Sequence, residues 1–257
     1  MRIVTLIENL VYKKGLVAEH GLSLYIECDF GKILFDTGQS SAFLQNAQQL
    51  NVNIEEIDFV IISHGHYDHA GGLEFFLKKN KKAIVYIKED AFLRKFDSHG
   101  KFIGIKCSPS LISGRIKYVT GIIELYPGVF IMPDIPIINK NDTRFGNSKD
   151  EFIDELYLAI IHNGELSIVS GCSHRGITNI LNAATAKFNL PVNLVLGGFH
   201  TKDCNEENFK IVLEYFQDNM PKSLGVCHCT GIDKYAAFKQ NLNTRVYYNY
   251  TGTITEL

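Results

Sequence analysis

Residues 58–72 read DFVIISHGHYDHAGG, and this stretch decides the fold class that we expect. The run 58–63 is continuous, apolar and β-branched, which predicts a strand buried on both faces, as in a parallel sheet. His64, His66, Asp68 and His69 follow in a glycine-rich loop. In an open α/β sheet, residues just beyond the carboxyl ends of the strands line the ligand-binding edge. The stretch therefore predicts clustered imidazoles at one edge of a sheet.

Three further predicted strands are also followed by a histidine. These pairs are LSIVSG (166–171) with His174, LVLGG (194–198) with His200, and LGVC (224–227) with His228. Neutral imidazole is the commonest protein ligand for zinc and its neighbours among the transition metals. Because strand ends meet along one sheet edge, five or six histidines with Asp68 predict a site for two metal ions.

The spacing within HGHYDH supports the same interpretation. His64 and His66 flank Gly65 on a tight turn, which points two ring nitrogens at one ion. Asp68 and His69 follow closely enough to reach a second ion. A string of this kind rarely arises by chance, and the alternative is a polar loop of capping histidines.

Apolar periodicity and turn residues predict alternating strands and helices elsewhere. The predicted strands span residues 2–7, 22–28, 32–35, 83–87, 156–162, 165–171, 192–198, 224–228 and 245–250. The predicted helices span about 40–50, 73–79, 176–188, 205–217 and 231–241. We found no internal repeat, linker or composition shift, so we expect a single α/β domain over residues 1–257. Residues 90–150 have the weakest pattern and predict hairpins and an irregular insertion, with 139–151 as a mobile segment or lid.

Composition excludes several classes of protein. The 257 residues are 46% hydrophobic and 21% charged, which is typical of a globular chain and excludes disorder. A net charge of -2 argues against sequence-independent binding of nucleic acid. No apolar run approaches the length of a membrane span, and the chain starts as a strand instead of a signal peptide. We therefore expect a cytoplasmic protein whose six scattered cysteines are free thiols.

HGHYDHAGG, together with LFDTG at 34–38, resembles the signature pair of the metallo-β-lactamase superfamily. Four other pieces are similar to the subfamily named for dihydropterin–ribofuranosylaminobenzene phosphate synthase: EHGLSLYIE (19–27), SGCSH (170–174), GGFH (197–200) and CHCTG (227–231). Bacterial members of that subfamily are mostly called metal-dependent hydrolases. The resemblance implies a four-layer αββα sandwich with metals at one end. It also implies a hydrolase or a dihydropteroate-synthase-like transferase.

The resemblance also implies the metal ligands. One ion would be held by His64, His66 and His174, and the other by Asp68, His69 and His228. Zinc is the expected metal, with iron or manganese as alternatives. Asp36 would contact a ligand without binding the metal itself, and would orient that ligand or the loop. Its alternative role is to cap a helix.

One departure from the family pattern concerns the second ion. Many members supply an aspartate that bridges both metals, whereas the segment 170–174 has no acidic residue. Cys172 takes that place as a thiolate ligand or is a buried inert thiol, and in the latter case the second site is weak or empty. Cys227 and Cys229 alternate with His228, so on an extended strand they would point away from it as packing residues.

The remaining polar candidates concern the substrate and the surface. His200 lies outside the implied ligand sets, so we interpret it as a substrate-facing acid, base or phosphate contact. Loops that open helices offer backbone N–H groups to an anion at Ser173, Thr230 and Gly231. Three basic side chains could assist in binding the anion: Lys202, Arg144 and Arg175. Histidines expected at the surface, away from the site, are His20, His99 and His162.

The leading functional hypothesis is a hydrolase, or related transferase, that uses a metal-activated water. Asp68 would orient the water as well as bind metal, and the substrate would be a small phosphorylated molecule or ester. Two alternatives stay open: a di-iron redox protein on the same fold, and a non-catalytic metal-dependent binding or sensor module. Relatives with di-iron centres typically have Glu where His66 stands, which favours the hydrolase. The sequence does not predict the oligomeric state.

Overall fold

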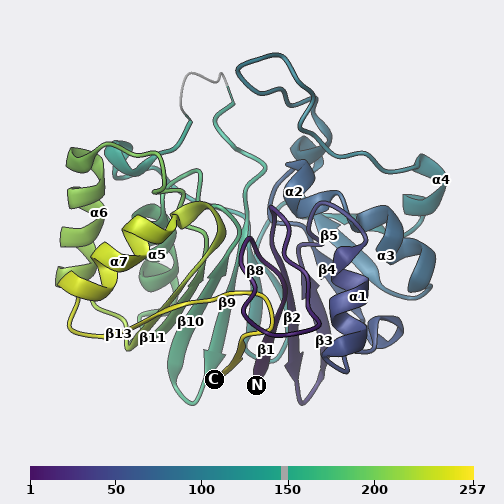
Figure 1. Cartoon of the computed structure of the whole chain (residues 1–257), viewed down its shortest axis with the longest axis horizontal. Helices are drawn as coiled ribbons and strands as arrows, with labels where there is room; N and C mark the ends of the chain where they lie inside the picture. Colours follow the sequence, from purple (N-terminus) through teal and green to yellow (C-terminus); the bar gives the residue numbers. More distant parts are fainter. Residues whose placement is uncertain (146–149) are drawn as a thin grey trace. The chain divides into compact units, whose positions relative to one another are not determined.

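The computed structural model describes residues 1–145 and 150–257 of the chain. The chain divides into two compact units, Met1–Thr120 with Tyr250–Leu257, and Gly121–Asn249. Each unit contains one seven-stranded sheet with helices packed on it (Figure 1). A single domain over residues 1–257 stays a prediction. Residues 146–149, which belong to the predicted lid, lie outside the described residues.

The sheet of the first unit has the strand order β14-β1-β2-β3-β4-β5-β6. Its strands are β1 (Arg2–Ile7), β2 (Ser23–Cys28), β3 (Gly31–Phe35), β4 (Phe59–Ile61), β5 (Ile84–Ile87), β6 (Ile116–Tyr118) and β14 (Ile254–Glu256). Strands β14, β1, β2 and β3 pair antiparallel, whereas β3, β4, β5 and β6 pair parallel. The parallel half aligns the carboxyl ends of β3 and β4, and both predicted motifs of this unit begin there.

The helices of the first unit are α1 (Ala42–Gln49), α2 (Tyr67–Ala70), α3 (Leu73–Lys79) and α4 (Pro109–Ile112). Phe43 of α1 and Phe76 of α3 are fully buried and join a hydrophobic cluster with Leu34 and Val60 of the sheet. Burial of each such side chain contributes about 1.5–3 kcal/mol to stability. This packing holds α1 and α3 against the sheet and anchors the loop between β4 and α3.

The sheet of the second unit has the strand order β13-β12-β11-β10-β9-β8-β7. Its strands are β7 (Ile123–Tyr126), β8 (Val129–Met132), β9 (Tyr157–His162), β10 (Glu165–Ser170), β11 (Val192–Gly197), β12 (Ser223–Val226) and β13 (Arg245–Tyr248). Strands β10 to β13 are parallel, and their connections contain α5 (Ile177–Phe188), α6 (Glu206–Asp218) and α7 (Ile232–Asn241). The three histidine-bearing loops of this unit follow β10, β11 and β12.

Most predicted elements lie within one or two residues of the observed ones. The β9–β10 hairpin turns at Asn163 and Gly164, both with positive φ, as a type I′ turn requires. Strand β14 was not predicted, since three alternating residues near a terminus give little periodic signal. Within residues 90–150, β6 extends the first sheet and β7–β8 form a hairpin. Among the described residues, no helix is both long enough and apolar enough to cross a membrane.

Candidate metal centre

The carboxyl ends of β3 and β4 bring Asp36 and Ser63 together in the first unit. Phe35 pairs with Ile61, and the Asp36 N–H donates to the Ile61 carbonyl at 2.8 Å. The Asp36 side chain turns back toward β4, where its Oδ1 accepts from the Ser63 N–H at 2.7 Å. Asp36 is fully buried and has a φ of 59°, a left-handed conformation that is costly for a non-glycine residue. The loop is therefore held in one conformation by a buried carboxylate.

Asp36 also orients two histidine rings. His69 Nδ1 lies 2.6 Å from Asp36 Oδ2, and the Ser63 hydroxyl donates to the same oxygen at 2.7 Å. Ser63 Oγ then lies 2.9 Å from His64 Nδ1 and accepts from it. With both Nδ1 atoms acting as donors, Nε2 of His64 and of His69 keeps its lone pair. This carboxylate–histidine arrangement is typical of metal ligands.

The imidazoles of the first unit form a compact donor set. His64 Nε2 lies 3.2 Å from His66 Nδ1, close to the roughly 3.3 Å that separates two nitrogens bound to one tetrahedral zinc ion. The rings of His64 and His69 lie 4.3 Å apart, and both side chains are fully buried. The chemistry and spacing of these donors fit a transition-metal ion.

Asp68 lies on α2 and contacts a histidine that we had expected elsewhere. Its Oδ2 lies 3.7 Å from His69 Nε2 and 3.2 Å from His20 Nε2. The His20 side chain is 55% exposed, as expected. The prediction that His20 lies away from the histidine cluster was wrong. The contact joins residues far apart in the chain, so no local pattern predicts it. The sequence signal was that His20 lies within EHGLSLYIE, one of the pieces that carried the resemblance.

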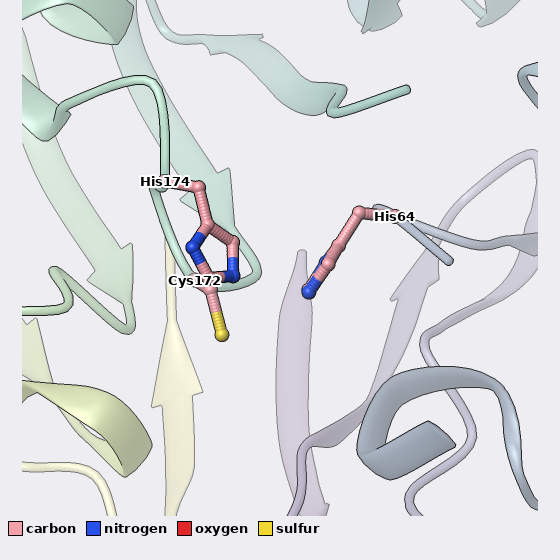
Figure 2. A group of neighbouring side chains, drawn as sticks. All are labelled: His64, Cys172 and His174. Atoms are coloured by element: carbon pink, nitrogen blue, oxygen red, sulfur yellow. The ribbon is translucent and has the colours of Figure 1, made fainter. Parts of the chain in front are cut away.

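The second unit presents Cys172 and His174 on the loop after β10, and His228 on the loop after β12. Figure 2 shows the side chains of His174 and Cys172 on one short loop, and the His64 ring of the first unit. Cys172 Sγ lies within 4.8 Å of a ring nitrogen of His174 and within 4.8 Å of one of His228. All three side chains are 3% exposed. Their donor chemistry fits a soft transition metal such as zinc.

Each of the three loops contains a non-glycine residue in the left-handed region. The φ angles are 57° at Ser173, 48° at His200 and 53° at His228. Such residues cost on the order of 1–3 kcal/mol each, persist only where their surroundings hold them, and cluster at functional sites. The strain therefore coincides with the three histidine-bearing loops of the second unit.

A buried acid that we did not predict fixes the His174 loop. Glu155 is fully buried, and its carboxylate accepts from the N–H of His174 at 2.7 Å and from that of Arg175 at 2.8 Å. Burial raises the pKa of Glu155 to about 7. The Phe152 ring stacks on the His174 ring, with centroids 3.8 Å apart. The only sequence signal was an acidic residue directly before an apolar strand.

Arg144 joins two of the histidine loops. Its backbone N–H donates to the His174 carbonyl at 2.6 Å, and its Nε donates to the His200 carbonyl at 3.1 Å. The guanidinium also pairs with Asp142 at 2.9 Å. His200 is half-buried, and its ring lies 4.4 Å from that of His174. The Arg144 side chain, which we expected to assist an anion, therefore holds the backbone of these loops.

The groups expected to bind an anion make bonds within the chain. Ser173 Oγ donates to the Gly198 carbonyl at 2.7 Å, and Thr230 Oγ1 accepts from the Phe199 N–H at 3.0 Å. Arg175 donates to the carbonyls of residues 135 and 151. These side-chain bonds fix the loops, and the Thr230 N–H donates to the Cys227 carbonyl at 3.0 Å. Anion binding by the backbone N–H groups of Ser173 and Gly231 stays a prediction. Two further candidates, Gly231 and Lys202, pack against each other: a Cβ on the glycine would lie 3.0 Å from the lysine Cβ.

The extended geometry that we assumed for Cys227 and Cys229 was wrong. Strand β12 ends at Val226, and residues 228–230 form a 3-10 turn instead of an extended strand. Cys227 is fully buried, in agreement with a packing role. Cys229 is half-buried, and its thiol contacts the Cys172 carbonyl at 3.5 Å. The other two histidines expected at the surface are His99, which is exposed, and His162, which is half-buried at the end of β9.

Strand-end imidazoles with carboxylate and thiol neighbours, on α/β sheets, are donor groups that could hold a metal ion in a protein of the α/β class. Residues 18–176 match the family model described as the metallo-beta-lactamase superfamily. The chain therefore belongs to this superfamily, whose members are mostly enzymes, and the predicted αββα sandwich is confirmed as its fold class.

Individual relatives cover nearly the whole chain. The chain is 31% identical to 7,8-dihydropterin-6-methyl-4-(beta-D-ribofuranosyl)-aminobenzene-5'-phosphate synthase of Methanocaldococcus jannaschii, over 90% of this chain and 88% of the relative. It is 33% identical to an uncharacterized protein of the same organism, over 95% and 96%. A solved structure of a metal-dependent hydrolase of the beta-lactamase superfamily matches with a TM-score of 0.88 and 30% identity, over 100% and 99%.

Proposed function

We propose that this protein is a metal-dependent hydrolase, or a related transferase, that acts on a small anionic substrate. The observation that carries the proposal is the orientation of the histidines in the first unit. The Ser63 hydroxyl accepts from His64 Nδ1 and the Asp36 carboxylate accepts from His69 Nδ1, so Nε2 of each ring carries the lone pair that can bind metal. Hydrogen bonds from Nδ1 to a carboxylate or hydroxyl oxygen are typical of histidines that bind metal through Nε2.

The proposed ligands are five histidines, one carboxylate and one thiol. They are His64, His66 and His174 for one ion, Asp68, His69 and His228 for the other, and Cys172 as an additional thiolate ligand. Zinc suits this mixture of imidazole, carboxylate and thiol, with iron or manganese as alternatives. When bound, the metal would lower the pKa of a water molecule to near 7 and polarise the substrate oxygen.

Two side chains would handle protons and water. The Asp68 carboxylate would accept a hydrogen bond from the attacking water and so orient it. His200, half-buried beside His174, would act as an acid or base or would contact the substrate. Imidazole suits that role because its ordinary pKa is close to neutral pH.

A cavity in the first unit supports an anionic substrate. Its volume is about 230 Å³, and it is lined by Gln39, Tyr67, Gly71, Lys101, Phe102, Gly104 and Lys106. Two ammonium groups beside aromatic rings suit a phosphate or carboxylate attached to an apolar or planar group. One lining residue, Tyr67, directly precedes the proposed ligand Asp68 in α2. The phosphate in the name of the Methanocaldococcus relative supports the same substrate class.

Metal analysis combined with an activity screen tests the proposal. We expect purified protein to contain zinc, iron or manganese, and zinc- or manganese-loaded protein to hydrolyse at least one phosphomonoester, phosphodiester, lactone or thioester. His66→Ala should abolish turnover without lowering the unfolding midpoint of the metal-free protein, whereas the matched surface variant His99→Ala should retain turnover. Unchanged turnover in metal-stripped protein would refute the proposal. Inactivity across all substrate classes at full metal occupancy would favour a binding or sensor module.

A further inference from the structure

We propose that His20 is a positioning residue that orients the Asp68 carboxylate by donating its Nε2–H to Oδ2. The two atoms lie 3.2 Å apart. This inference rests on the proposed function, in which Asp68 binds metal and orients water. It gives a role to the EHGL string at residues 19–22, which the implied ligand sets leave without one.

The tautomer of His20 follows from Asn9. The Asn9 amide oxygen accepts from the Gly21 N–H at 3.2 Å, which fixes the orientation of the amide. Its Nδ2 therefore faces His20, at 3.4 Å from Nδ1. An amide nitrogen only donates, so Nδ1 is the acceptor and the ring proton lies on Nε2. The protonated Nε2 is then the ring nitrogen that lies 3.2 Å from Asp68 Oδ2, so it can donate to the carboxylate.

The residues on both sides of His20 hold this string against α2. Gly21 has a φ of +147°, and a Cβ there would lie 2.4 Å from the Asp68 carbonyl oxygen. The Leu22 N–H donates to the same carbonyl at 3.2 Å. The Glu19 carboxylate accepts from the backbone N–H groups of Gln39 and Ser40 at 3.1 and 3.2 Å. The backbone next to His20 therefore packs directly on Asp68, which places the His20 ring beside the Asp68 carboxylate.

The consequence for Asp68 is a restrained side chain. A carboxylate held by one hydrogen-bond donor does not rotate freely about its Cβ–Cγ bond, so both oxygens keep their directions. Partners of this kind typically change metal affinity or activity about 10- to 100-fold when they are removed. Because His20 is 55% exposed, water competes for the bond, and we expect about tenfold.

The competing role for His20 is direct metal ligation, which needs a lone pair on Nε2 and hence the opposite tautomer. Long-range ¹H–¹⁵N correlation of the metal-free protein identifies the protonated nitrogen. We expect Nε2 to be protonated, and we expect Asn9→Asp, whose carboxylate accepts from Nδ1–H, to place a proton on Nδ1. A proton on Nδ1 alone in the wild type would overturn the inference.

A double-mutant cycle on zinc affinity, measured by competition with a chelating indicator, provides the second test. We expect His20→Ala to bind zinc about tenfold more weakly and His20→Gln, whose amide keeps a donor near Nε2, to recover most of the loss. In the Asp68→Asn background, His20→Ala should have no further effect. His99→Ala is the control for loss of an exposed imidazole.

The outcomes separate this inference from the proposed function. Additive losses in the cycle, or wild-type affinity in His20→Ala when Asp68→Asn binds weakly, would overturn the role of His20 alone. Wild-type zinc affinity in Asp68→Asn would overturn the ligand role of Asp68, and with it the proposed centre. The unfolding midpoint of metal-free His20→Ala should match that of the metal-free wild type, since loss of a merely structural residue would lower it.

Discussion

Asp36→Asn should lower both the stability of the metal-free protein and its affinity for zinc. The buried Asp36 carboxylate accepts three hydrogen bonds, from the Ser63 N–H, the Ser63 hydroxyl and His69 Nδ1, at 2.6–2.7 Å. Asparagine is nearly isosteric, so the bond from the Ser63 N–H is kept and no cavity forms. Its NH₂ group replaces Oδ2 and donates where an acceptor is needed.

The expected magnitudes follow from those bonds. The Ser63 hydroxyl can rotate and accept from the new amide, whereas His69 Nδ1–H loses its acceptor. A hydrogen bond to a charged group contributes about 1.5–3 kcal/mol, so the free energy of unfolding should fall by about 2 kcal/mol. Two donors, the new amide NH₂ and His69 Nδ1–H, then face each other. His69 avoids this conflict when its proton moves to Nε2, which removes the lone pair proposed for the metal. We therefore expect zinc affinity to fall by a further factor of about 10 to 100.

Urea denaturation of the metal-free protein and zinc competition titration measure the two effects. Asp58→Asn is the matched control, because Asp58 is a partly exposed aspartate directly before β4 that bonds Lys32 and Lys82. It should leave zinc affinity unchanged. Wild-type zinc affinity in Asp36→Asn, with the His69 proton still on Nδ1, would refute the orienting role of this carboxylate.

Asp142 should give the chain a pH-dependent stability. Burial raises its pKa from 3.8 to about 6, so between these values the folded chain binds more protons than the unfolded chain, and the free energy of unfolding falls by roughly 3 kcal/mol as the pH rises. Denaturation of wild type and Asp142→Asn across this range isolates the slope, and parallel curves would contradict it. Arg144→Lys should lose the bond to the His200 carbonyl and cost about 1–3 kcal/mol, because an ammonium cannot reproduce the guanidinium fork; denaturant midpoints check this. Gly21→Ala should cost about 3 kcal/mol or more through its clash at 2.4 Å, against about 1–2 kcal/mol for Gly114→Ala, which has positive φ but open space. Equal losses in the two variants would contradict the close packing.

The sequence predicts the strand ends well for a physical reason. A strand buried on both faces must be apolar throughout, so the first polar residue after it marks the sheet edge. This is why residues 58–63 and 166–171 place the histidines that follow them correctly on strand-end loops. The β9–β10 hairpin is predictable because Asn-Gly adopts two positive φ angles at little cost.

Supporting groups are harder to predict because their partners are distant in the chain. Residues 139–145 are polar and suggest a mobile segment, yet Asp142 is fully buried and bonds the N–H and hydroxyl of Thr178. Asn139 is likewise held by Asn179. Polar composition indicates mobility only where the polar groups face water. Here they satisfy the amino end of α5, which no local pattern specifies.

The two units fix their histidines at different levels of structure. In the first unit, the buried acid Asp36 contacts side chains, so it determines which ring nitrogen of His69 faces away from it. In the second unit, the buried acid Glu155 contacts backbone N–H groups, so it determines the path of the loop that bears His174. A change to the first acid therefore alters donor chemistry, and a change to the second alters loop geometry. The role of Asp36 was predictable because orienting a ring requires a carboxylate at a fixed place, and that place belongs to the motif LFDTG. Any acceptor side chain that reaches two backbone N–H groups could hold the loop as Glu155 does, so no sequence motif indicates it.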